Sequence, residues 1–158
     1  MCVAKASGTA YRFVEPSAEP PEIDEGALQR ARSAIEKLKN AYLTEWAPSA
    51  IDELDRVIRF AGSSVELAPE NLHAAYRLAH DMKGQGATFG FELLSEFGSA
   101  LVTMTFEREE ATPAEITAML AYVAAARAVI DQRLDDPYCD DAVAVKAKLE
   151  SALKASFH

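Results

Sequence analysis

The sequence predicts an all-α protein, folded as an up-and-down antiparallel four-helix bundle with an added N-terminal helix and a C-terminal helix. Three observations favour this fold class. Apolar residues recur at spacings of three and four along five or six segments, the connections between these segments are short, and no segment alternates as a β-strand does. Short connections between amphipathic helices are typical of antiparallel bundles. A chain of 158 residues also suits one hydrophobic core rather than two.

The N-terminal part of the chain predicts a leader and two helices. Residues 1–23 have no sustained period and hold three of the seven prolines, so we expect a flexible leader there. Asp24 can cap a helix over about 25–45. Pro48 interrupts the pattern of that helix and suits the first turn of a second one, which ends at Gly62. The apolar stripes are Leu28, Ala31, Ile35, Leu38 and Tyr42 on the first helix, and Ile51, Leu54, Val57, Ile58 and Ala61 on the second.

The rest of the chain predicts four more helices. The third covers about 69–88 and the fourth about 91–107. The pattern Thr112–Glu115 fits a capping box that opens a fifth helix, and a last helix follows Pro137. Their core stripes are Leu72, Ala75, Leu78, Ala79, Met82 and Gly86 on the third, Leu94, Phe97, Leu101 and Met104 on the fourth, Ile116, Met119, Leu120, Val123, Ala126, Val129 and Ile130 on the fifth, and Val143, Val145, Leu149 and Leu153 on the last.

The third helix carries the most informative motif, His80 followed by Lys83 and Gly84. Residues three and four apart share one face of a helix, so an imidazole, an ammonium and bare backbone converge on one surface spot. A neutral imidazole is a competent nucleophile toward a phosphoryl group, and a neighbouring ammonium can compensate the charge of the product. We therefore expect His80 to accept the phosphoryl group, Lys83 to stabilise it and Gly84 to admit a partner protein.

The two glycines of this helix have different explanations. Each one costs on the order of 1 kcal/mol relative to alanine in a helix interior, so each needs a reason. Gly86 projects toward the core, where close helix packing is sufficient. Gly84 projects beside His80 on the open face, where packing supplies no reason and access for another protein does. We expect the surrounding partner-binding surface to comprise His73, Tyr76, Arg77 and Ala87.

The run AHDMKGQGATFGF, residues 79–91, closely resembles the histidine phosphotransfer (HPt) domain family, and it is similar also to the phosphoacceptor domain of chemotaxis histidine kinases. The resemblance implies a four-helix bundle whose phosphorylated histidine lies on the second helix. It thereby places the four core helices at about 47–134, within a single HPt-like domain over 24–158. It also implies the same roles for Lys83 and Gly84 that their positions on the helix suggest.

One position departs from the family pattern. The resemblance implies a Gln or Glu on the next helix that hydrogen-bonds the imidazole, and an ungapped comparison places Val102 there. Valine cannot form that bond. Ser99 and Thr103 lie close by in sequence and could offer a hydroxyl, whereas Gln85 points about 140° away from His80 around its helix.

Charge and composition exclude several classes of function. Sixteen basic against twenty-five acidic residues give a net charge of −9, which repels nucleic acid and anionic membranes. No apolar run approaches the roughly 20 residues that cross a bilayer, so we expect a cytoplasmic protein. Cys2 and Cys139 have no metal-ligand spacing. His73 and His80 are separated by about 10.5 Å of helix rise, too far to share one zinc ion, so we expect no metal and no cofactor.

Two functions remain, from different classes. The chain lacks a nucleotide-binding loop and kinase signatures, so a phosphoryl group must come from another protein. The first function is that of a monomeric, bacterial phosphorelay protein that shuttles a phosphoryl group between receiver-domain aspartates, with magnesium on the receiver and a hybrid histidine kinase as a further partner. The alternative, which Val102 favours, is a non-catalytic helical adaptor or scaffold.

Overall fold

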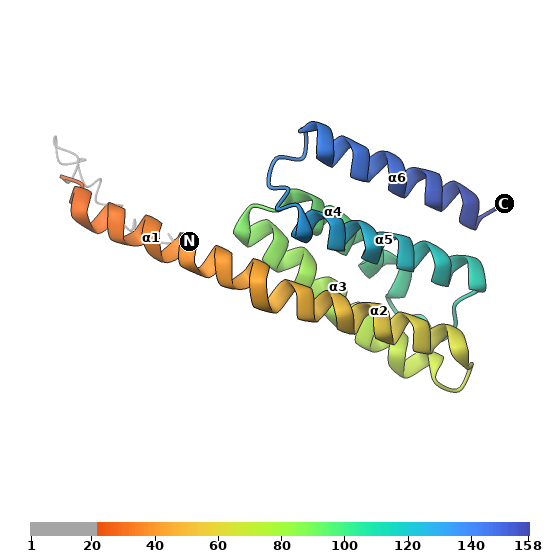
Figure 1. Cartoon of the computed structure of the whole chain (residues 1–158). Helices are drawn as coiled ribbons and strands as arrows, with labels where there is room; N and C mark the ends of the chain where they lie inside the picture. Colours follow the sequence, from red (N-terminus) through yellow and green to blue (C-terminus); the bar gives the residue numbers. More distant parts are fainter. Residues whose placement is uncertain (1–21) are drawn as a thin grey trace, which may run out of the picture.

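Six α-helices joined by short connections make up residues 22–158, the part of the chain that the computed structural model describes (Figure 1). They are α1 (Glu25–Ala41), α2 (Ala47–Ser63), α3 (Ala68–Phe89), α4 (Glu92–Thr105), α5 (Pro113–Asp131) and α6 (Asp140–Ser156). Residues 22–158 contain no strand, so the all-α class is confirmed. The leader predicted over 1–23 lies almost wholly outside the described residues.

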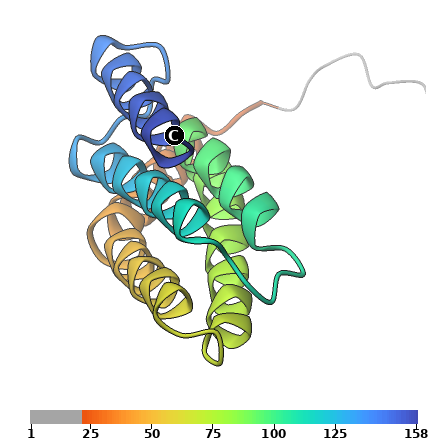
Figure 2. The same ribbon diagram turned by 90° about the vertical axis from the view of Figure 1, so that its right-hand side faces the viewer.

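The four-helix bundle consists of α2, α3, α4 and α5, each packed against two neighbours in a closed ring (Figure 2). Successive helices run in opposite directions, as predicted, and α6 runs back along α5 (Figure 1). Lys146 of α6 also pairs with Glu96 of α4 at 3.5 Å. The largest fully buried aliphatic side chains, each contributing about 1.5–3 kcal/mol relative to exposure, include Ile51, Leu54, Ile58, Leu72, Leu94, Leu101 and Met119.

A continuous rod joins α1 to α2, which corrects the break predicted at Pro48. Residues Tyr42–Trp46 form a π-helical turn, in which the N–H of Ala47 donates to the carbonyl oxygen of Tyr42, five residues earlier. Proline lacks an N–H for the ordinary helical bond, and its ring crowds the carbonyl four residues before it. The wider π turn relieves that crowding. Pro48 therefore lies in the first turn of α2, as expected, without ending the helix before it.

The apolar stripe predicted for α1 meets the core only at its end. Tyr42 is 1% exposed and stacks on Phe89 with ring centroids 4.7 Å apart. Ile35 and Leu38 are 59% and 53% exposed, and no residue of α1 is buried within residues 22–158. The physical reason is that α1 projects past the end of the bundle (Figure 1), so the extensive contacts of this helix are with the π turn that continues it.

Two other predicted core positions are displaced by one residue. Val143 of α6 is 54% exposed, and the adjacent Ala142 is buried instead. On α4, Met104 is only partly buried while Thr105 is 2% exposed. The polar Thr105 can be buried because its hydroxyl donates to the carbonyl oxygen of Leu101 at 2.7 Å within its own helix.

A tight connection turns α3 into α4. Gly90 ends α3 with φ +80°, in the left-handed region that glycine adopts without a steric penalty. The N–H of Phe91 donates to the carbonyl oxygen of Gly86 at 2.8 Å, which closes the turn. This geometry brings α4 back along α3, and the α3–α4 pair has the most extensive contact in the bundle.

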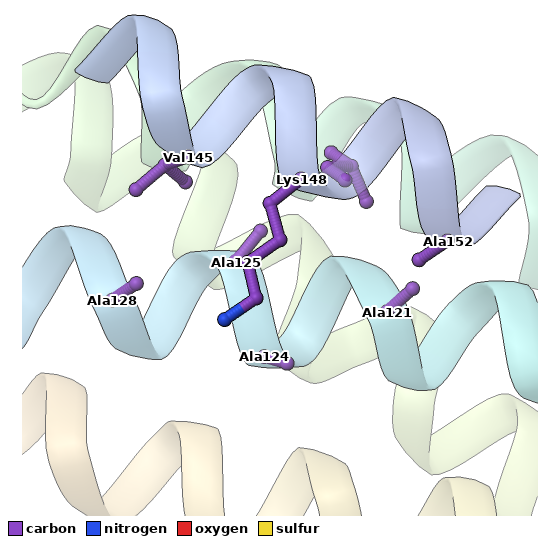
Figure 3. Close-up of a pocket in the computed structure, with 8 residues that line it drawn as sticks. Ala121, Ala124, Ala125, Ala128, Val145, Lys148 and Ala152 are labelled. Carbon is purple, nitrogen blue, oxygen red and sulfur yellow. The ribbon is translucent and has the colours of Figure 1, made fainter. Parts of the chain in front are cut away.

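By length and composition, α5 alone among the described helices could cross a membrane. In the structure it packs against α2, α4 and α6, the usual position of an apolar core helix in a bundle. An apolar groove of about 160 Å³ remains where α6 covers it. Figure 3 shows Val145 and Ala152 of α6 facing α5, with Lys148 extending across that helix. No residue of this groove belongs to α3, where the sequence places the candidate site.

Candidate functional site

One face of α3 carries the residues that the sequence singled out. Ala75, Ala79 and Met82 are buried on the opposite side of the helix, whereas His80, Lys83 and Gly84 are exposed. At 3.6 residues per turn, the exposed residues lie within about 60° of His80 around the helix axis. We call this surface the His80 face, and it comprises His73, Tyr76, Arg77, His80, Lys83, Gly84 and Ala87.

Gly84 leaves an open patch beside His80. A methyl group added at Gly84 would meet no atom within 4 Å outside its own helical turn. A methyl group added at Gly86 would lie 2.8 Å from the backbone nitrogen of Ser95 and 2.9 Å from the side chain of Leu94. Gly86 is thus a packing residue, as predicted, while among the described residues Gly84 packs against no neighbouring helix.

A third glycine, which the sequence analysis overlooked, sets the spacing of α3 and α4 directly behind the site. A methyl group at Gly98 of α4 would lie 2.7 Å from the backbone nitrogen of Lys83 and 2.9 Å from the carbonyl oxygen of Ala79. These atoms flank His80 in sequence, so the turn that presents the imidazole rests directly on the backbone of α4. The sequence does indicate this close contact, because Gly98 interrupts an otherwise apolar helical pattern.

Aromatic rings border His80 on its N-terminal side. Tyr76, one turn earlier and half-buried, has its ring centroid 6.1 Å from that of the imidazole. Phe106, at the end of α4, lies 5.6 Å from Tyr76 and is 52% exposed. Phe106 was missed in the sequence because it follows the last turn of its helix, where the apolar period gives no information.

A shallow groove borders the site on its C-terminal side, between α3 and α4. The groove has a volume of about 550 Å³ and is lined by Lys83, Ala87, Glu92, Ser95, Glu96 and Ser99. Lys83 and Ala87 thereby lie together, as the predicted partner surface requires. The opposite wall carries the serine and glutamate side chains of α4, whereas the surface on the other side of His80 is aromatic.

The position expected to orient the imidazole is apolar in the structure too. Val102 is partly buried and packs against the core. Thr103 is exposed, and its hydroxyl donates to the carbonyl oxygen of Ser99 at 3.1 Å, within α4. Ser99 lines the groove beside Lys83. Gln85 borders a different recess, between α2 and α3, in agreement with its expected direction away from His80.

Two cations flank His80 along α3. Arg77 and Lys83 lie one turn before and after the imidazole, and neither forms an ion pair with any residue in 22–158. Their charges are therefore available on a chain whose net charge is −9. His73 is exposed on the same face, two turns before His80. No three His, Cys, Asp or Glu side chains gather as a metal site within the described residues.

The comparisons with known proteins add one finding. The sequence model of the family called Hpt domain matches residues 25–131, which include α1 to α5 and the whole His80 face. The searches of curated proteins and of solved structures each return no match. The family match covers more than half of the chain and agrees with the helical bundle. The chain therefore belongs to the Hpt domain family, whose members take part in phosphotransfer in two-component systems.

Proposed function

We propose that this protein is a phosphorelay shuttle, in which His80 accepts a phosphoryl group from the aspartate of one receiver domain and passes it to the aspartate of another. The observation that carries the proposal is the coincidence, on one exposed helix face, of an imidazole with Lys83 and with the open backbone at Gly84. The family match supports phosphotransfer in general. The proposal adds to this general role the partners, which are receiver domains, and the direction of transfer from one receiver to another.

The transfer step needs little from the protein beyond a nucleophile and charge compensation. A neutral imidazole nitrogen of His80 attacks the phosphorus of the receiver's aspartyl phosphate; the N–P bond forms as the O–P bond breaks, and the aspartate leaves as a carboxylate. The phosphoryl group on His80 carries about two negative charges, and Lys83 offsets them from one turn away. Any magnesium ion belongs to the receiver domain, and the reverse reaction uses the same groups.

Approach of a receiver domain requires an exposed and shaped surface. Gly84 allows the receiver's active site to close over the imidazole because nothing there projects beyond the helix. The exposed ring of Phe106 offers an apolar contact on one side, and the groove at Lys83 offers a shallow recess on the other. We place the protein in the cytoplasm, where receiver domains and hybrid histidine kinases present their aspartates.

The test is phosphoryl acceptance from receiver domains charged with acetyl phosphate. The wild-type chain is expected to acquire an acid-labile, alkali-stable label, and His80→Ala to lose it completely while its circular dichroism stays unchanged. His73→Ala is the matched control, because His73 is an exposed histidine on the same face of the same helix. Label retained in His80→Ala would refute the assignment. A failure of every receiver to label the wild type would favour the adaptor function that Val102 suggests.

A further inference from the structure

The exposed stripe of α1 is the largest feature that the proposed function leaves unused. Ile35 and Leu38 are 59% and 53% exposed, and the stripe ends at the buried Tyr42. Most of α1 projects from the bundle, whereas its last turn contacts the bundle through Lys39, which pairs with Asp135 at 3.1 Å (Figure 1). Although α1 continues into α2, none of its 17 residues is buried, and most helical stability in proteins comes from packing of an apolar face. The stripe therefore calls for a partner surface.

The spacing of the stripe is that of a coiled-coil seam. Leu28, Ala31, Ile35, Leu38 and Tyr42 alternate steps of three and four residues. This is the average period of 3.5 residues that pairs one helix with another along a narrow line. Ala27, Ala34 and Ala41 flank the seam on one side, at spacings of seven residues. Small flanking residues let a second helix approach closely.

The charges of α1 and its cap indicate which helix fits. Residues 22–31 carry Glu22, Asp24 and Glu25 against Arg30, a net charge of −2. Residues 32–41 carry Arg32, Lys37 and Lys39 against Glu36, a net charge of +2. A second α1 in antiparallel orientation sets the acidic half of each helix against the basic half of the other, whereas parallel pairing sets like charges together.

We propose that the stripe of α1 is a self-association surface, which pairs antiparallel with α1 of a second copy of this chain. In this register Leu28 of each copy packs on Leu38 of the other, and Ala31 packs on Ile35. Glu25 faces Lys39 of the other copy at both ends of the contact. The pairing is two-fold symmetric and closed, so it stops at a dimer. It replaces the monomer that the sequence suggested, and it uses no residue of the His80 face.

The register contains one unfavourable contact, which is itself informative. Arg32 lies at the edge of the seam nearest the two-fold axis. The Arg32 side chains of the two copies therefore face each other, and their positive charges repel. Arg32→Gln is expected to strengthen the dimer for this reason. In a parallel pair Arg32 lies at the same level as Arg32 of the other helix but faces the alanine side, so the substitution has little effect there.

The main test is sedimentation velocity of the full chain from about 1 µM to about 300 µM. The wild type is expected to shift from monomer to dimer with concentration. Ile35→Glu with Leu38→Glu is expected to raise the dissociation constant at least about tenfold, because it places charges in the seam. Gln29→Glu with Ser33→Glu is the matched control, since it adds the same charge to the same helix outside the seam and should leave the dimer intact.

Orientation is tested by exchanging the charges of the facing pair. Glu25→Lys alone is expected to weaken the dimer, and Glu25→Lys with Lys39→Glu to restore it. In a parallel pair these residues are about 21 Å apart along the axis, so the double variant would restore nothing. Because Lys39 also contacts Asp135 at 3.1 Å, the melting temperature of each variant is measured alongside.

Two results would overturn the proposal. One is a monomer at every concentration, and the other is a dimer that survives Ile35→Glu with Leu38→Glu. If the chain is monomeric, hydrogen exchange decides whether residues 1–21 cover the stripe, because the double variant would then increase exchange in that segment. A labelling assay at His80 run on the same samples separates this question from phosphotransfer, since the stripe variants change no residue of the His80 face.

Discussion

The two sides of α3 differ most clearly at two glycines that are only two residues apart. At Gly86 an added methyl group would collide with Ser95 and Leu94 of α4, while at Gly84 it would meet nothing. Both residues carry the same cost in helix propensity, about 1 kcal/mol. On one side that cost is recovered by close packing of two helices. On the other side no contact within residues 22–158 recovers it, and the proposed docking of a receiver domain would supply the reason for Gly84.

The largest expected effect comes from filling the packed side. Gly98→Ala and Gly86→Ala should each lower the free energy of unfolding by about 2 kcal/mol, since the new methyl group lies within 3.0 Å of backbone atoms that cannot move independently. Gly84→Ala should instead raise the free energy of unfolding by up to about 1 kcal/mol. Urea titration of the three variants measures these free energies of unfolding. Equal changes in Gly84→Ala and Gly86→Ala would contradict the difference between the open and the packed side of α3.

A longer side chain at the open position should separate docking from reactivity. Gly84→Gln is expected to slow transfer from a phosphorylated receiver at least about tenfold, because the side chain occupies the space in which the receiver closes. Labelling by phosphoramidate, a small donor, should change much less, and the melting temperature should hold or rise slightly. The docking argument fails if both donors lose the same factor, or if receiver transfer stays normal.

A smaller effect is expected when the charge beside His80 is removed. Lys83→Ala should slow phosphotransfer severalfold, up to about tenfold, while some labelling persists, since the nucleophile remains. Lys154→Ala, which removes an exposed lysine from the last turn of α6, is the control for net charge. Rapid-quench kinetics with one receiver measures both. Unchanged rates in Lys83→Ala would show that the ammonium contributes no compensation.

The last effect is confined to alkaline pH and concerns Tyr42 in the π turn, where burial raises the pKa of the phenol to about 12. The unfolded chain loses this proton near pH 10 and the folded chain near pH 12, so folding is progressively disfavoured as the pH rises from 10 to 12. Below pH 10 the tyrosine has no effect on the pH dependence of stability. Tyr42→Phe should flatten the alkaline part of the stability profile, and an identical profile in both proteins would refute the link.

Sequence alone anticipated the class of fold, because each bundle helix has an apolar stripe that its neighbours bury. It placed the helix that carries His80 and explained Gly86 by packing, and both agree with the structure. It did not find Gly98 or Phe106, because contacts between α3 and α4 depend on how the two helices are aligned. The apolar period of one helix does not determine how that helix is aligned with its neighbour.

The apolar stripe of α1 is a second case in which the sequence pattern of a helix does not identify its packing partner. Its pattern is as regular as that of α2, yet α2 buries six residues and α1 buries none in residues 22–158. An apolar stripe predicts that a helix has a face to bury, but the partner depends on where the helix ends relative to the others. The continuity through Pro48 was hidden for a similar reason, since a π turn leaves no distinct pattern in the sequence.

The π turn at Tyr42–Trp46 also fixes the rotational phase between the two halves of the rod. A π turn is equivalent to one residue inserted into an α-helix, and one residue corresponds to about 100° of rotation. The direction in which the α1 stripe points is therefore set at these five residues rather than by α1 itself. Deleting one residue between Leu43 and Trp46 would rotate the stripe by about 100° about the axis of α1, so the loss of a single codon redirects that surface without altering any residue on it.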